Sequence, residues 1–153
     1  MIYNRTLEDV ENAREIIETK VKKFLELTEE ELDILNRGYV SVNTINRIEN
    51  QQTMLKNLFN SMGYYNSHNE NKEWGYSDIF KQIDLDRIVE NTVLLRKAFF
   101  TFSYTPENPN AKYYFEDFNR MEKILFDLED MANEIKSLYL ECGTFECGEV
   151  NNQ

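Results

Sequence analysis

The sequence is poor in the residues that break helices, with only five Gly and two Pro in 153 positions. Few positions can therefore form the tight turns that many short strands would require, which argues against an all-β fold. Hydrophobic residues make up 41% and charged residues 29%, a balance typical of a chain that folds. At this length we expect one domain spanning residues 1–153.

Residues with reactive or metal-binding side chains are also scarce. The one His, His68, lies in a polar stretch and not at the Glu-x-x-His spacing of a helix-bundle metal site. The two Cys, Cys142 and Cys147, are too close together for a bridge to close a useful loop, so we expect free thiols. No Gly-rich phosphate loop or catalytic triad motif is present. We therefore expect no catalytic, metal or cofactor site, and a protein that is not an enzyme.

The sequence also has few basic residues and no long apolar run. Lys and Arg number 17 against 28 Asp and Glu, for a net charge of −11, which disfavours nucleic acid as a partner. No run of about 18 apolar residues could cross a membrane, and the start lacks the apolar core of a secretory signal. These features predict a protein made in a cytoplasm. We expect most of the acidic side chains to lie on outer faces that are exposed to solvent. The alternative is that they form a negative surface for a basic partner.

Capping residues and periodic apolar positions predict helices along most of the chain. Thr6 with Asp9, Thr28 with Glu31, and Ser41 or Asn43 mark three helix starts. The first helix carries an apolar stripe for packing, interrupted once, at Leu7, Val10, Arg14, Ile17, Val21 and Phe24. The second helix is expected to end with a left-handed exit at Gly38, and the third at Gly63. A fourth helix begins near Asp84 and is broken by prolines at 106 and 109.

The last helix gives the clearest pattern. Apolar residues alternate three and four apart at Tyr114, Phe118, Met121, Leu125, Leu128, Ala132, Ile135 and Tyr139. A second apolar set widens this stripe, so we expect at least two other helices or another subunit to cover it. The prediction is an all-α bundle of four to five helices over 1–140, with a long C-terminal helix. Residues 141–153, a repeated Glu-Cys-Gly doublet, are expected to form a short extended tail or hairpin.

Aromatic residues in the expected loops and apolar residues of the tail are the candidate contact residues. Trp74 and Tyr76 are expected to fold back onto the core from a loop over residues 64–75. Loop aromatics of this kind serve more often as core lids than as binding hot spots. The candidate interaction residues are Trp74, Tyr76, Tyr104, Cys142, Phe145, Cys147 and Val150.

Several ordered strings in this chain resemble a module found in tail, baseplate and tail-fibre proteins of phages and prophages of Firmicutes. They are Asn4-Arg5-Thr6-x-x-Asp9-Val10, Gly38-Tyr39, Asn46-Arg47-Ile48-Glu49, Trp74 with Asp78-Ile79, Arg87 with Asn91, Thr105-Pro106, and Asn119 with Met121-Glu122-Lys123-Ile124-Leu125. The closing doublet is similar to the family's repeated aromatic-Ser-Gly-Glu pattern. It departs from that pattern at Cys142 and Cys147, which replace small hydroxyl residues, and at Glu141 and Glu146, which stand at aromatic positions.

The resemblance implies a non-enzymatic virion structural or assembly protein that binds other tail or baseplate proteins, or itself as a homo-oligomer. Such a protein would be made in the host bacterial cytoplasm and assembled into the virion tail. A second hypothesis comes from charge alone: a small acidic inhibitor or regulator, encoded by a phage, that occupies a basic groove of a host defence or nucleic-acid-handling protein. The sequence does not identify the partner.

Overall fold

The structure is a computed structural model that describes the backbone of residues 2–65 and 67–142, and side chains up to Leu138. In this part of the chain every regular element is helical. The elements are α1 (Leu7–Thr19), the 3₁₀ turn η1 (Val21–Lys23), α2 (Glu29–Gly38), α3 (Val42–Ser61), α4 (Gln82–Ala98) and α5 (Phe115–Cys142). The predicted all-α bundle with a long last helix is confirmed. Helix α5 continues into the predicted tail as far as Cys142, and residues 143–153 lie outside the described residues.

The predicted helix starts are confirmed in atomic detail. Thr6 and Asp9 form a reciprocal capping box on α1, and Thr28 and Glu31 form a second one on α2. Of the two candidates for α3, Ser41 is the cap, since its hydroxyl accepts from the Thr44 amide. Each cap pairs amides of the first turn that would otherwise lack an acceptor.

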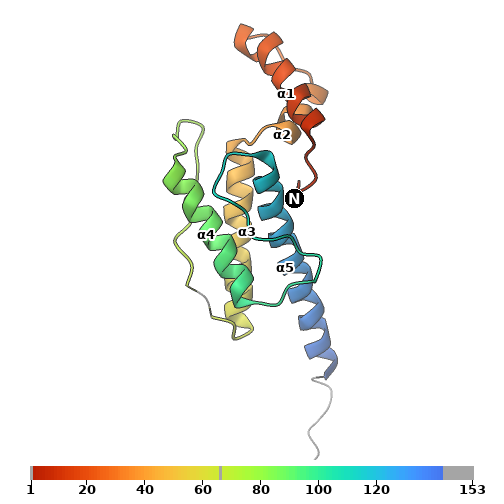
Figure 1. The fold of residues 1–153 in the computed structure, drawn as a ribbon, viewed down its shortest axis with the longest axis vertical. Coiled ribbons are helices and arrows are strands. Elements are labelled where there is room, and N and C mark those ends of the chain that lie inside the picture. The colour runs from red at the N-terminus through yellow and green to blue at the C-terminus, as the bar shows by residue number, and fades with distance from the viewer. Residues whose placement is uncertain (1, 66, 143–153) are drawn as a thin grey trace, which may run out of the picture.

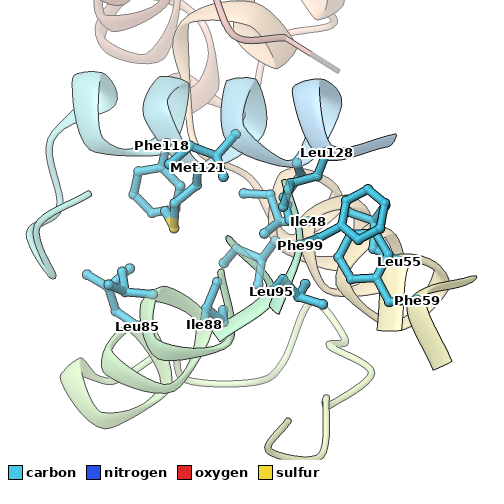
Figure 2. Packing of buried hydrophobic residues seen from close by; sticks show 14 of the residues in the cluster. Ile48, Leu55, Phe59, Leu85, Ile88, Leu95, Phe99, Phe118, Met121 and Leu128 are labelled. Atoms are coloured by element: carbon cyan, nitrogen blue, oxygen red, sulfur yellow. The ribbon is translucent and has the colours of Figure 1, made fainter. Parts of the chain in front are cut away.

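Helices α3, α4 and α5 pack side by side and enclose the hydrophobic core (Figure 1). Figure 2 shows side chains from the three helices meeting, with Phe118, Met121 and Leu128 of α5 above residues of α3 and α4. Gln52 of α3 is also fully buried, and its amide donates to the Ile88 carbonyl and to the Thr92 hydroxyl of α4. The wide apolar face of α5 is therefore covered by two other helices, as predicted.

Helices α1 and α2 form a separate hairpin that lies beyond the end of this three-helix core (Figure 1). Ala13 is the one hydrophobic residue of α1, η1 and α2 that is fully buried. The stripe predicted for packing is packed only in part: Val10 and Ile17 are half-buried, whereas Leu7 is 62% and Phe24 97% exposed. The fully buried residue of α1 is Ala13, which packs against α2 beside the stripe.

Two further expectations are corrected. Gly38 does not form a left-handed helix exit; it lies inside the last turn of α2, where a Cβ would stand 2.0 Å from the Asp9 carbonyl oxygen. The left-handed exit is confirmed at Gly63, with φ of 85°. Tyr76 does not fold back onto the core and is 86% exposed. No helix in the described part of the chain is both long and apolar enough to span a membrane.

Candidate protein-binding groove

A groove of about 600 Å³ lies where the α1/α2 hairpin meets the beginnings of α3 and α5. One wall is formed by the start of α1, with Leu7, Val10 and Arg14. The other wall is formed by the segment that enters α5, and the floor includes Val40, Ile45, Phe80 and Phe118. The lining is mainly apolar and aromatic, which is the character of a surface that binds another protein or peptide.

Four large side chains on the rim of the groove are more than half exposed. They are Leu7 at 62%, Tyr39 at 57%, Tyr113 at 53% and Tyr114 at 61%. Tyrosine and leucine gathered in this way leave apolar area in water that a partner could cover. Tyr rings also carry a hydroxyl for hydrogen bonds, which suits them to interfaces.

The hairpin that forms the first wall is held by a close helix contact. Gly38 has no side chain, so α2 approaches α1 closely enough that Ala13 packs directly against it. Arg37 adds an ion pair, its Nε donating to Asp9 Oδ1 at 2.8 Å. The Thr6 backbone amide donates to Asp9 and lowers the pKa of that carboxyl, as does the Arg37 charge, so the carboxylate persists below its ordinary range.

The segment that leads into α1 is fixed to α5 by a buried charged cluster. Arg5, Asn119, Glu122 and Arg47 form it. Arg5 Nη1 lies 2.6 Å from Glu122 Oε2, with both side chains removed from water, and Arg47 Nη2 lies 2.5 Å from the other Glu122 oxygen. The Asn119 amide group donates to the Arg5 carbonyl and accepts from the Arg5 amide. This cluster sets where α1 begins relative to α5, and so the width of the groove.

A second buried cluster holds the long connection between α3 and α4. Glu49 of α3, 1% exposed, accepts from the Trp74 indole, from the Lys72 amide and from Arg87. Asn46 brackets the Trp74 backbone, donating to its carbonyl and accepting from its amide, each at 2.9 Å. The connection is thereby pinned across the outer side of α3 and α4, and it brings Phe80 to the groove.

Nine residues of the strings that resemble the phage module meet in these two clusters. Arg5, Arg47, Asn119 and Glu122 build the first; Asn46, Glu49, Trp74 and Arg87 build the second. Asn91 extends the second, bonding to Asn69 and Asn71 of the same connection. These nine residues therefore make long-range contacts of the fold.

The predicted interaction residues are dispersed. Trp74 is 4% exposed and belongs to the core, so it supports the fold and does not present a contact surface. Tyr76 is exposed, outside the groove lining. Tyr104 is 63% exposed and stacks on Phe102, with ring centroids 4.9 Å apart. The Cys142 side chain and the tail residues Phe145, Cys147 and Val150 lie outside what the structure describes.

The sequence reasoning missed the residues of the groove rim. Leu7 is the first residue of the apolar stripe predicted on the first helix, but we expected other residues of the same chain to cover that stripe. Tyr39 follows Gly38 and Tyr113 precedes α5, so each lies next to a helix end where periodicity carries little information. Tyr114 was predicted as the first apolar position of the last helix, but it lies just before α5 and is 61% exposed. Aromatic residues at or just outside the ends of the predicted helices were the available signal.

Two titratable groups illustrate the chemistry that the fold offers. Burial, followed by the charges of Asp84 and Asp86, raises the pKa of Tyr113. Burial, followed by the charge of Lys56, lowers the pKa of His68 in the α3–α4 connection. Among the described side chains no group of three or more His, Cys, Asp or Glu is placed to hold a metal ion.

Comparison of the chain with models of protein families, with curated proteins and with solved structures gives no match.

Proposed function

We propose that this chain is a non-enzymatic structural or assembly protein of a bacteriophage tail or baseplate, and that it acts through protein–protein contacts at the groove. The observation that carries the binding role is the apolar rim formed by Leu7, Tyr39, Tyr113 and Tyr114, between a protruding hairpin and the core. The phage setting is supported by the ordered strings, several of whose residues share the two buried clusters. If this chain and the phage module share a fold, the residues of these strings would have to make the same contacts in both.

The form of the molecule agrees with a docking role. The three-helix core is a support from which the α1/α2 hairpin projects (Figure 1). Several apolar side chains of the hairpin are exposed, among them Leu7, Leu32 and Ile34. A hairpin of two short helices gains little stability by itself, so covering its exposed face would stabilise it further.

The proposal is tested in particles of the phage or induced prophage that encodes the chain. Mass spectrometry of purified particles should detect the protein at a fixed ratio to other tail proteins. Val10→Glu places a charge in the groove wall and should reduce incorporation by about tenfold, since a charge buried without a partner costs several kcal/mol. Tyr65→Ala changes an exposed aromatic residue outside the groove lining and should leave incorporation unchanged. Particles that lack the protein, with tails assembled normally in its absence, would overturn the proposal.

A second candidate, a small acidic inhibitor of a basic host protein, is favoured by one feature. The exposed side of α1 carries Glu8, Glu11, Glu15 and Glu18, on a chain with a net charge of −11. Such a surface attracts cationic partners, and salt weakens the attraction. A pull-down from host lysate separates the candidates, because a basic host protein released by salt supports the inhibitor, whereas tail proteins retained in salt support assembly.

A further inference from the structure

The apolar stripe of α1 and η1 is only partly covered by the described residues: Val10 and Ile17 are half-buried, whereas Leu7, Val21 and Phe24 are exposed. Ala13 faces α2, and the stripe lies beside it on the helix. Its two ends are the most exposed, Leu7 at 62% and Phe24 at 97%. Phe24 also has a left-handed backbone, with φ of 55°, which is costly for a bulky residue. A strained aromatic residue held fully in water at the hairpin tip calls for a contact outside the chain.

The spacing of the stripe is symmetric. From Leu7 to Phe24 its positions alternate three and four apart and read the same from either end. Helix α1 itself ends at Thr19, and Val21 and Phe24 belong to the 3₁₀ turn η1 and its left-handed cap. A second copy placed antiparallel to the first about a two-fold axis brings its Phe24 end beside Leu7.

The charges of α1 and η1 fit the same arrangement. The start of α1 is acidic, with Glu8 and Glu11, and the 3₁₀ turn η1 that follows α1 is basic, with Lys22 and Lys23. In the antiparallel register the acidic start of each copy lies beside the basic end of the other. Arg14, near the axis, comes beside the second copy's Glu15 and Glu18. On a chain with a net charge of −11 most self-contacts are repulsive, so this register is favoured over others.

The groove provides space for the second copy's hairpin tip. Leu7 and Val10 form its wall, and Leu7 is the residue that would lie beside the second copy's Phe24. At about 600 Å³ the groove has room for more than one side chain, and the rings of Tyr113 and Tyr114 line its opposite side.

We propose that two copies of this chain associate through antiparallel α1 helices, each inserting its Phe24 tip into the groove of the other. The inference deepens the proposed function by naming one occupant of the groove, and it rests on that proposal only in treating the groove as an interface. The result is a closed two-fold dimer, because both tips and both grooves are used.

The experiment exchanges charges between the start of α1 and η1 in the full chain. One variant carries Lys22→Glu and Lys23→Glu; the other carries Glu8→Lys and Glu11→Lys. Each alone should self-associate about tenfold more weakly than wild type, because like charges then face each other at both ends. An equimolar mixture should form a heterodimer with close to wild-type affinity, because each altered end meets an end of opposite charge. Analytical ultracentrifugation measures all three, and circular dichroism verifies that each variant keeps its helices.

Lys136→Glu, an exposed charge reversal on α5, is the matched control and should leave self-association unchanged. A wild-type chain that remains monomeric at all concentrations, or variants that self-associate as wild type does, would overturn the inference. So would a mixture that associates no better than its components. A monomer found in purified particles would overturn only the dimer, whereas a dimer absent from particles would overturn only the tail role.

Discussion

Gly38 lies directly against the backbone of Asp9, so that a Cβ added to Gly38 would stand 2.0 Å from the Asp9 carbonyl oxygen and 2.6 Å from the Ala13 Cβ. Two helices approach this closely only where one of them lacks a side chain. The contact sets the separation of α1 and α2, and with it the position of the groove wall.

Gly38→Ala should therefore separate the hairpin. The obstructing atom is backbone, which cannot turn aside, and overpacking of this kind costs about 1–3 kcal/mol or more. Urea denaturation should show the loss, and amide exchange in α1 should accelerate. Gly75→Ala is the control, since the nearest atom to its Cβ would be an Asp78 oxygen at an ordinary 3.8 Å. Equal stability of the two variants would contradict the close contact.

Glu122→Gln should destabilise the fold while keeping its shape. The change leaves Arg5, whose side chain is removed from water, without its carboxylate partner. Removal of one member of a buried ion pair typically costs about 3–5 kcal/mol. Chemical denaturation measures the change, and Glu134→Gln on the exposed side of α5 should stay near wild type. A loss no larger than that of the control would show that the cluster contributes little to stability.

Asn46→Ala should release Trp74 from the core. The amide group of Asn46 makes two hydrogen bonds to the Trp74 backbone, and their loss should cost about 1–3 kcal/mol. Trp74 is the single tryptophan, so its fluorescence reports directly: emission should shift to longer wavelength and acrylamide should quench it more. Asn50→Ala, an exposed residue one turn further along α3, should leave the spectrum unchanged. An unshifted spectrum in Asn46→Ala would show that the core alone holds the ring.

Acid should weaken the hairpin caps. Hydrogen bonds from Thr6 lower the pKa of Asp9 below its ordinary value of 3.8, and Lys20, followed by the Thr28 amide, lowers the pKa of Glu31 below 4.5. Lowered carboxyl pKa values mean that the stabilisation is complete above the ordinary values and is lost as pH falls through the folded-state values. Below about pH 4, amide signals of the first turns of α1 and α2 should therefore shift before those of α3. Asp9→Asn should abolish the pH response of the α1 cap alone, whereas simultaneous loss of all helices would contradict the prediction.

The helices and their starts were predictable because the signals are local. A Thr or Ser at the cap, a carboxylate three residues later in α1 and α2, and an apolar stripe are read within one helix. What the sequence could not reveal is how distant segments meet. Gly38 ends α2 as predicted, but its close contact with Asp9 could not be read from the sequence, so it was interpreted as a left-handed exit. The α1 stripe was interpreted as core because periodicity does not say which element covers it.

The groove was missed for the same reason. Its walls come from segments as far apart as Leu7 and Tyr114, and no pattern in either segment identifies the other. From the sequence, Trp74 could be assigned to the core only because aromatic residues in loops more often cover the core than serve as binding hot spots. Its burial depends on Glu49 and Asn46, one helix earlier.

The pairing of Arg5 with Glu122 joins residues separated by 117 positions. During synthesis on a ribosome, the α1/α2 hairpin can form as soon as residues 7–38 emerge, but the anchor that orients it does not yet exist. It becomes available only when α5 has been made. Until then the hairpin is not anchored and its exposed apolar residues, Leu7 and Phe24, are in solvent. Any contact that covers them early would protect the nascent protein from aggregation.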